Sequence, residues 1–210
     1  MDTADTHADE YDDATVALLE LVWGAGFMAP GGAQNVRKLV AGLDVRGKTI
    51  LDIGCGLGGG DIVLARDLGA KVVGIDLEAP LIARAQAYVD AASLSDRISL
   101  RQVAPGPLDF PDASFDVVYS SGAFTQTQDK AGIFAEVFRV LKPGGAITSY
   151  DWMGIDQPHS ADMLHWFEVE GLTYALETLP GHARLLEGAG FTQVNVRDDE
   201  GWYTQEAQNE

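Results

Sequence analysis

The feature that most constrains this chain is a glycine-rich segment, LDIGCGLGGG, at residues 51–60. An apolar run at 48–54 predicts a buried strand before it, and helical periodicity continues after it as far as Gly69. Because glycine has no Cβ, Gly54 and Gly56 permit a sharp turn and a close approach of the backbone to a ligand. The N-terminus of the following helix offers free N–H groups to an anionic group. This order of strand, glycine turn and helix is typical of a nucleotide-binding site.

Strands and helices alternate along the chain, which predicts an α/β fold whose parallel sheet has helices on both faces. The expected strands are 48–54, 71–76, 97–103, one within 111–122, 146–152 and 192–198, and the expected helices include 13–23, 79–94, 129–145 and 182–191. Asp76 closes the second strand, 18 residues after Gly58. A carboxylate at this place accepts hydrogen bonds from two ribose hydroxyls.

Composition excludes several classes of partner. The 210 residues contain 14 Lys and Arg against 32 Asp and Glu, a net charge of −18, without a basic cluster. Neither nucleic acid nor an anionic membrane surface is therefore an expected partner. The one cysteine, Cys55, and the acidic start MDTADTHADE predict a cytoplasmic protein without a disulfide or signal peptide. His159, His165 and His182 lack metal-ligand spacing, so no metal is expected.

The glycine spacing differs from that of dinucleotide-binding folds. Gly54-x-Gly56-x-Gly58, preceded by Asp52, resembles motif I of the class I methyltransferases that use S-adenosylmethionine. The resemblance extends to three further segments: GID at 74–76, FPDASFDVVYS at 110–120 and FAEVFRVLKPGG at 134–145. A nicotinamide oxidoreductase is disfavoured by the same spacing and by these later motifs.

Within that family, the chain is similar to the phosphoethanolamine N-methyltransferase branch and its bacterial relatives. The similar segments are EYDDATVALLELVWGAGFMAPGG at 10–32, LDIGCGLGGG, SYDW at 149–152 and the tail GFTQVNVRDDEGWYTQEAQNE. In that branch an N-terminal helix lies over the cofactor and bears a tyrosine that helps to close the site. Tyr11 matches this tyrosine by its spacing to Gly24. A partly buried ring that anchors a helix explains Tyr11 equally well.

The resemblance implies a Rossmann-like sheet, seven-stranded in the family, that binds S-adenosylmethionine. The cofactor-binding residues that it implies are Met28, Asp52, Gly54, Gly56, Gly58, Asp76, Leu77, Ala104 and Ser120. It also divides the single domain, 1–210, into an N-terminal lid (1–36), a cofactor-binding core (46–151), a substrate cap (152–180) and a C-terminal helix and strand (181–210). The family continues past the position of Glu210 with a helix and a last strand, so the C-terminal strand is expected to be missing.

Three departures from the branch concern its ligands. The Arg-Asp pair and the histidine that follow the fourth strand in phosphobase enzymes correspond to Ser121, Gly122 and Gln126. The phosphate-binding arginine corresponds to Leu172. The carboxylate that bonds the adenine amine corresponds to Ala104, within VAPGP. We therefore expect an acceptor that differs from a phosphobase.

The segment 150–178 is expected to cap the substrate, because it holds five aromatic residues, six acids and no Lys or Arg. Such a pocket attracts cationic amines by Coulomb and cation–π interactions. Taken one at a time, each ring is explained equally well as part of the core, and each acid as part of a solvated helix face. We expect a small, non-phosphorylated amine as acceptor. Its expected substrate residues are Trp152, Glu168 and Tyr174, with Tyr11 and Gln126 at catalytic positions. The alternative is a methyltransferase-fold binding or scaffold protein, and we expect a monomer or weak homodimer.

Overall fold

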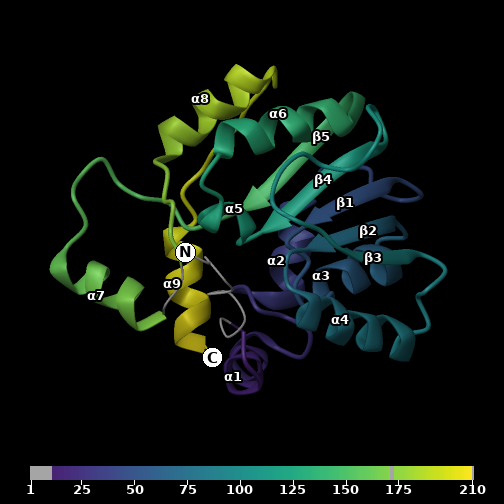
Figure 1. Ribbon diagram of the computed structural model, residues 1–210, viewed down its shortest axis with the longest axis horizontal. Coiled ribbons are helices and arrows are strands. Elements are labelled where there is room, and N and C mark those ends of the chain that lie inside the picture. Colours follow the sequence, from purple (N-terminus) through teal and green to yellow (C-terminus); the bar gives the residue numbers. More distant parts are fainter. Residues whose placement is uncertain (1–10, 171–172, 210) are drawn as a thin grey trace, which may run out of the picture.

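The computed structural model describes residues 11–170 and 173–209 and confirms the predicted α/β class. Five strands form one parallel sheet in the order β3-β2-β1-β4-β5 (Figure 1). They are β1 Thr49–Ile53, β2 Lys71–Asp76, β3 Ile98–Gln102, β4 Phe115–Ser121 and β5 Leu141–Tyr150. The inner strands β1 and β4 are buried along most of their length, as strands covered on both faces must be.

Helices cover both faces of this sheet (Figure 1). On one face lie α2 Gly32–Leu39, α3 Gly59–Ile62 with its π-helical continuation η1 Val63–Asp67, and α4 Ala79–Ala91. On the other lie α6 Lys130–Val140 and α8 Leu179–Ala189. Successive side chains of a strand point to opposite faces, so Ile50 packs in the first of these cores and Leu51 in the second.

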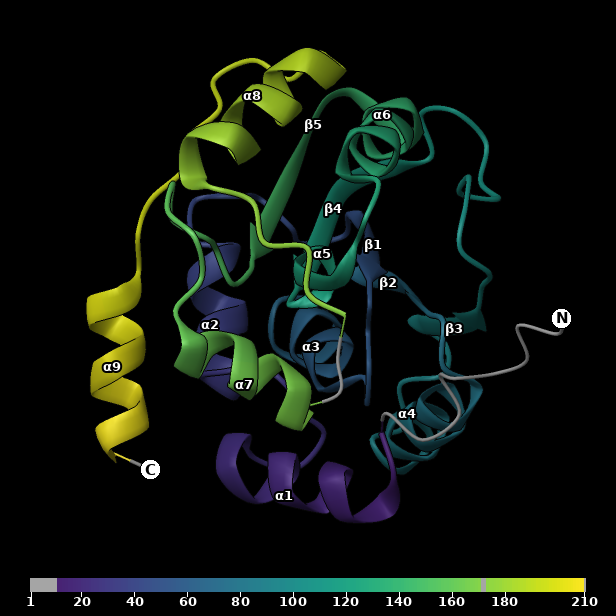
Figure 2. The same cartoon turned by 60° about the vertical axis from the view of Figure 1, so that its left-hand side comes forward.

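Further helices lie beyond the carboxyl ends of the strands, where ligands bind in open α/β sheets (Figures 1 and 2). They are α1 Asp13–Trp23, the short α5 Ala123–Gln126 after β4, α7 Ala161–Glu170 and α9 Glu200–Asn209. The rings of Trp202 on α9 and Tyr150 at the end of β5 meet edge to face at 6.0 Å. Lys38 of α2 lies 3.8 Å from the centre of the Trp202 ring, so α9 is fastened to the sheet by aromatic contacts.

The expected strand at 192–198 is wrong, because the structure has no strand in this segment. Gln193 has a φ of 58°, a left-handed conformation that an extended strand does not contain. Val194, whose alternation with Val196 suggests a strand, packs against the core cluster formed by Phe124, Phe134 and Leu186. Throughout the described part of the chain, no strand pairs with the outer edge of β5.

The boundary between α6 and β5 also differs from the expectation. The helix expected over 129–145 ends at Val140, and β5 begins at Leu141 instead of 146. The register between β4 and β5 shifts between Phe115 and Val117, so the LKPGG segment joins the sheet through an irregular start.

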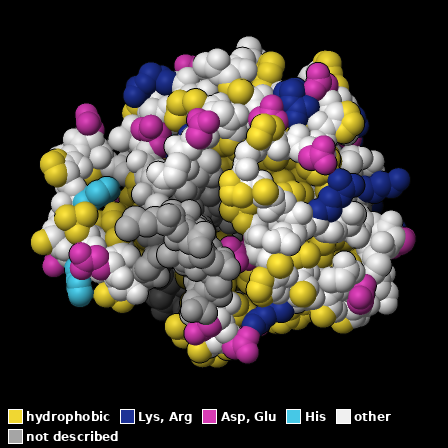
Figure 3. Space-filling model, viewed as in Figure 1, with side chains coloured by type: hydrophobic (Ala, Val, Ile, Leu, Met, Phe, Trp, Pro, Cys, Tyr) yellow, Lys and Arg dark blue, Asp and Glu magenta, His cyan; other side chains and the backbone are white. Residues whose placement is uncertain are grey.

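The surface carries mixed charge. On the face drawn in Figure 3, lysine and arginine side chains lie singly or in small groups among acidic ones. In the segments that the structure describes, no helix has the length and apolar character needed to cross a membrane.

We predict that Gly59→Ala lowers the free energy of unfolding by about 1–3 kcal/mol, because it forces two backbone segments apart. A Cβ on Gly59 would lie 2.8 Å from the carbonyl carbon of Gly26 and closer still to its oxygen. Urea denaturation followed by circular dichroism measures the change. Gly188→Ala in α8 is the matched control: nothing lies within 4 Å of its added methyl group. It should leave stability unchanged or raise it by up to about 1 kcal/mol. Equal losses in the two variants would contradict the prediction.

Candidate functional site

The turn after β1 forms the floor of the site. Gly54, Gly56 and Gly58 have φ angles of 76°, 52° and 78°, which an L side chain rarely adopts. The sulfur of Met28 would lie 3.3 Å from a Cβ on Gly56, so the segment before α2 lies directly over the turn. Gly58 instead faces Ala85 of α4, which a Cβ would approach to 3.2 Å. All three glycines therefore shape the turn through their backbone conformation, and Gly58 also allows α4 to pack closely against it.

Asp76 ends β2 beside this turn. Its carboxylate accepts hydrogen bonds from the backbone N–H groups of Gly56 at 2.8 Å and Glu78 at 3.0 Å. Burial raises the pKa of Asp76 despite these bonds. Each oxygen keeps a second lone pair for a ligand hydroxyl. Leu77, the next residue, is 50% exposed, and Ala104 is exposed in the segment after β3.

Two further carboxylates are buried under the turn. Asp52 of β1 is 2% exposed and Asp61 of α3 is fully buried. One oxygen of Asp52 and both oxygens of Asp61 have no hydrogen-bond partner among the described residues. Burial, followed by repulsion from Asp61, raises the pKa of Asp52 well above its usual range, and burial raises the pKa of Asp61 to about 7. The pair therefore concentrates negative potential beneath the turn as the pH rises through neutrality.

The two residues expected at catalytic positions contact each other. The amide Nε2 of Gln126 donates to the hydroxyl oxygen of Tyr11 at 3.4 Å. Gln126 ends α5, which leaves the sheet after β4, and Tyr11 lies two residues before the start of α1. The Tyr11 ring also packs on a cluster formed by Val16, Leu57 and Leu81. The polar atoms of Tyr11 and Gln126 thus meet beyond the carboxyl ends of the central strands.

Ser120 has a different environment from the other expected cofactor residues. It is fully buried at the end of β4, and its hydroxyl donates to the carbonyl oxygen of Ile53 at 2.9 Å. This bond joins the ends of β4 and β1, the two strands that carry the turn and α5.

Two of the three expected substrate residues lie in one aromatic cluster. Trp152 and Tyr174 both contact Trp166 of α7, with ring centres 6.4 Å and 5.1 Å apart. Glu168 is different: its side chain is 81% exposed and lies 3.8 Å from His165, so it is solvated and not enclosed by the rings. Leu172, where the branch has its phosphate-binding arginine, lies outside the described residues.

Sequence reasoning missed a buried polar anchor beneath the cap. Lys130 of α6 is 8% exposed, and its ammonium donates to the carbonyl oxygens of Thr127, at 2.8 Å, and Ala175. The N–H of Ala175 donates to the carbonyl of Thr125 at 2.9 Å, and the N–H of Thr125 donates to Asp151 at 3.1 Å. Burial lowers the pKa of Lys130 and raises that of Asp151 to about 6. The available signal was a lysine at a helix N-terminus, where the macrodipole disfavours a cation.

Comparison with known proteins agrees with the geometry. A methyltransferase-domain family profile matches residues 50–145. Over 190 residues the chain is 33% identical to phosphoethanolamine N-methyltransferase 1 of Arabidopsis thaliana, a match that covers 90% of this chain and 38% of that relative. The chain thus spans well under two thirds of the length of this curated relative.

Two solved structures of Haemonchus contortus phosphoethanolamine N-methyltransferase 2 share the fold. The complex with S-adenosyl-L-methionine has a TM-score of 0.88 at 24% identity, covering 96% of this chain and 47% of that one. The complex with phosphomonomethylethanolamine and S-adenosylhomocysteine has a TM-score of 0.85 at 25% identity, covering 94% and 46%.

We predict that Asp61→Asn stabilises the protein progressively as the pH rises. The pKa of Asp61 is raised from 3.8 to about 7 in the folded state. The folded protein therefore loses stability between these two pH values, and the loss is complete above the folded pKa. Asparagine keeps the shape without the charge, so the gain in the free energy of unfolding should be small at about pH 4 and larger at about pH 8. Urea denaturation across this range measures it.

Asp96→Asn is the matched control for Asp61→Asn, since Asp96 is exposed and its replacement removes the same charge. The control should show no pH-dependent gain. A gain for Asp61→Asn that is equal at the two ends of the pH range would contradict the prediction.

Proposed function

The chain belongs to the class I S-adenosylmethionine-dependent methyltransferases, and from this premise we propose that it transfers a methyl group from S-adenosylmethionine to the nitrogen of a small amine. The observation that carries the proposal is the contact of Tyr11 with Gln126 at 3.4 Å, beyond the strand ends. This contact places two polar side chains at the edge of the sheet where the family binds its ligands. Amine groups can donate to both of these side-chain oxygens.

The residues of the turn fit S-adenosylmethionine. We assign Gly54 and Gly56 to its methionine end, Asp76 to its ribose hydroxyls and Leu77 to its adenine ring. The one buried oxygen of Asp52 that has no hydrogen-bond partner among the described residues supports this assignment, because a nearby ammonium or sulfonium would lower its electrostatic cost. When bound, S-adenosylmethionine supplies an activated methyl group, and the protein's task is then mainly to align the acceptor and exclude water.

Gln126 suits an acceptor that needs no protein base. Its amide hydrogen-bonds an amine but does not remove a proton at neutral pH. Proton removal before attack then falls to water. We expect the pH dependence of the rate to follow the ionisation of the amine itself instead of a protein group.

The charge of the cap favours an acceptor without phosphate. From residue 143 to residue 183 the chain has no Lys or Arg. The ammonium of Lys130 reaches this cap, but it already donates to two backbone carbonyls and has Asp151 and Glu177 as neighbouring acids. Holding a phosphate takes a cation or a helix N-terminus with free donors, whereas the rings of Trp152 and Tyr174 attract a positive charge.

The second candidate acceptor is a phosphorylated amine. It is favoured by the name of the Arabidopsis thaliana relative, phosphoethanolamine N-methyltransferase 1, and by the phosphomonomethylethanolamine bound in one of the similar structures. A third possibility, a protein that binds ligands without turnover, is favoured by Ala104 and Gly122, which replace two carboxylates of the branch.

We predict that Asp76→Ala raises the dissociation constant for S-adenosylmethionine at least about tenfold, because hydrogen bonds to a charged acceptor contribute roughly 1.5–3 kcal/mol. Isothermal titration calorimetry of the folded variant measures the constant. Asp96→Ala removes the same charge at an exposed position and should leave it unchanged. An unchanged dissociation constant in a folded Asp76→Ala variant would contradict the assignment of Asp76 to the cofactor site.

We also predict that an unphosphorylated amine is turned over with a kcat/KM at least about tenfold above that of phosphoethanolamine. The assay measures release of S-adenosylhomocysteine with ethanolamine, its N-methylated forms, other small primary amines and phosphoethanolamine. Efficient turnover of phosphoethanolamine would overturn the charge argument. Cofactor binding without turnover of any amine would instead support the binding-protein alternative.

A further inference from the structure

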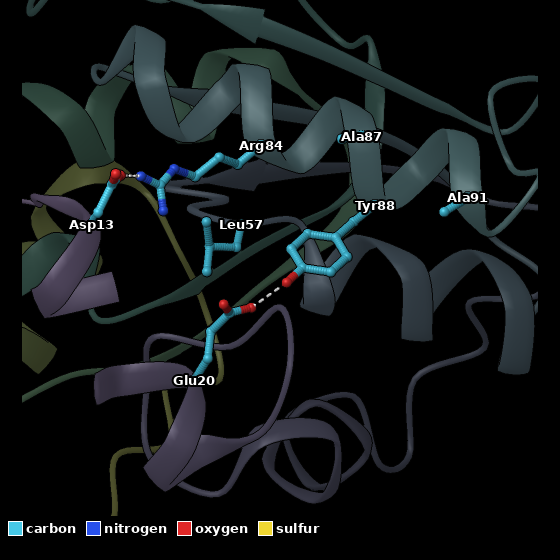
Figure 4. A pocket seen from close by; sticks show the side chains of 7 residues that line it. All are labelled: Asp13, Glu20, Leu57, Arg84, Ala87, Tyr88 and Ala91. Carbon is cyan, nitrogen blue, oxygen red and sulfur yellow. Dashed lines mark hydrogen bonds and ion pairs between the residues drawn. The ribbon is translucent and has the colours of Figure 1, made fainter. Parts of the chain in front are cut away.

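The apolar contacts of the helix α1 come mainly from its two ends: Val16 packs with Leu57 and Leu81, and the half-buried ring of Trp23 lies 6.4 Å from the ring of Tyr203 on α9. Within α1, Val16 is the residue that is buried. Leu18, Leu21 and Val22 are 60%, 82% and 39% exposed. A cavity of about 500 Å³ lies between α1 and α4 and is lined on the α1 side by Asp13 and Glu20 (Figure 4). An element with so little buried apolar surface opens at low free-energy cost unless polar bonds hold it.

Two polar links bridge this cavity, as Figure 4 shows. One is the ion pair of Asp13 with Arg84, in which the Asp13 side chain is 94% exposed. Exposed ion pairs contribute little. In the other, the hydroxyl of Tyr88 on α4 donates to Oε1 of Glu20 at 2.5 Å, and the same oxygen accepts the backbone N–H of Gly26 at 2.6 Å. Both of these bonds are charge-assisted and partly buried, which makes this link the stronger one.

The bonds of Glu20 continue to the glycine turn. The carbonyl of Gly26 accepts the N–H of Gly59, the first residue of α3, at 3.0 Å. Two residues after Gly26, the sulfur of Met28 lies over Gly56. At the opposite end of α1, Tyr11 contacts Gln126. Glu20 therefore fixes one end of a short helix whose other end reaches the position assigned to the acceptor.

We propose that Glu20 is a positioning residue that clamps α1 over the glycine turn through Tyr88 and Gly26, and so holds Tyr11 against Gln126 and Met28 over Gly56. This inference rests on the proposed function, in which α1 closes a methyltransferase site. Loss of the clamp opens α1 and leaves the sheet and the turn intact.

Hydrogen exchange of the full-length free protein tests the clamp without any ligand. In Glu20→Ala, the amides of residues 16–23 should exchange about tenfold faster or more, whereas those of β1 should keep their protection. Tyr88→Phe should give a smaller increase, because it leaves the bond from Gly26 to Glu20. Combining it with Glu20→Ala should add nothing, since the two side chains act through one bond. Asp13→Asn, on the same helix, is the control and should stay within about twofold of the wild type.

Cofactor binding and kinetics test the positioning role. S-adenosylhomocysteine should dissociate from Glu20→Ala about tenfold faster, while its association rate changes little. Both kcat and kcat/KM should fall, and Glu20→Gln, which retains an acceptor oxygen, should recover part of the loss. Unchanged exchange of α1 in both Glu20→Ala and Tyr88→Phe would overturn the clamp, as would faster exchange without any change in dissociation or turnover. Failure of the wild type to bind the cofactor would overturn the proposed function, and with it the positioning role, whereas the exchange comparison would still judge the clamp itself.

Discussion

Neighbouring segments approach the backbone closely at the turn between β1 and α3, and the positions of the surrounding elements depend on how close that approach is. Each glycine of the turn admits a different neighbour. Because Gly54 has no Cβ, Ala123 of α5 can lie close to it, and Gly56 leaves room for Met28 in the same way. Gly58 leaves room for Ala85 of α4, and Gly59 for the carbonyl of Gly26. One stretch of backbone therefore contacts three elements: α5, which carries Gln126; the segment with Met28 that lies over the turn; and α4, which carries Tyr88. A side chain at any of these positions would displace an element and not only a ligand.

Beneath the same turn lie two buried carboxylates whose burial is electrostatically unfavourable. Asp52 and Asp61 are buried, and three of their oxygens have no hydrogen-bond partner among the described residues. A free protein optimised for stability alone would replace one of them, since an unpaired buried charge is destabilising. A ligand that carries positive charge offsets this penalty when it binds. Under the proposed function, the stability that the free protein loses in this way would be recovered as binding energy when a cationic cofactor binds.

The sequence pattern predicts most of this fold because β1, β2 and β4 have short apolar runs next to glycine, which define strands without knowledge of their neighbours. In β3 the apolar Ile98 and Leu100 alternate with polar residues, which also indicates a strand. The same reasoning fails at 192–198, where Val194 packs against the cluster of Phe124, Phe134 and Leu186 without forming a strand and the backbone of Gln193 is left-handed. The glycine turn can be predicted from the sequence because its residues are consecutive.

The residues proposed to surround the acceptor could not be predicted from the sequence pattern in the same way. Tyr11 and Gln126 are 115 residues apart in the sequence, and resemblance alone paired them before the structure brought them into contact. The role of Lys130 cannot be predicted from its partners, because they are backbone carbonyls, which have no signature in a sequence. Glu168 was chosen by composition, and composition does not say which side of α7 faces the rings.

Under the proposed clamp, the arrangement of α1 follows from what a closing element must do. An ordinary surface helix turns its apolar side inward and its charges outward. Here Leu18 and Leu21 face solvent, whereas Glu20 is directed at α4. Attachment through a few charge-assisted bonds has a different consequence from attachment through a large apolar surface. The bonds fix the closed position sharply, yet opening breaks only a few of them and exposes little new apolar surface, so under the proposed function the helix would release a product and close again without disturbing the core.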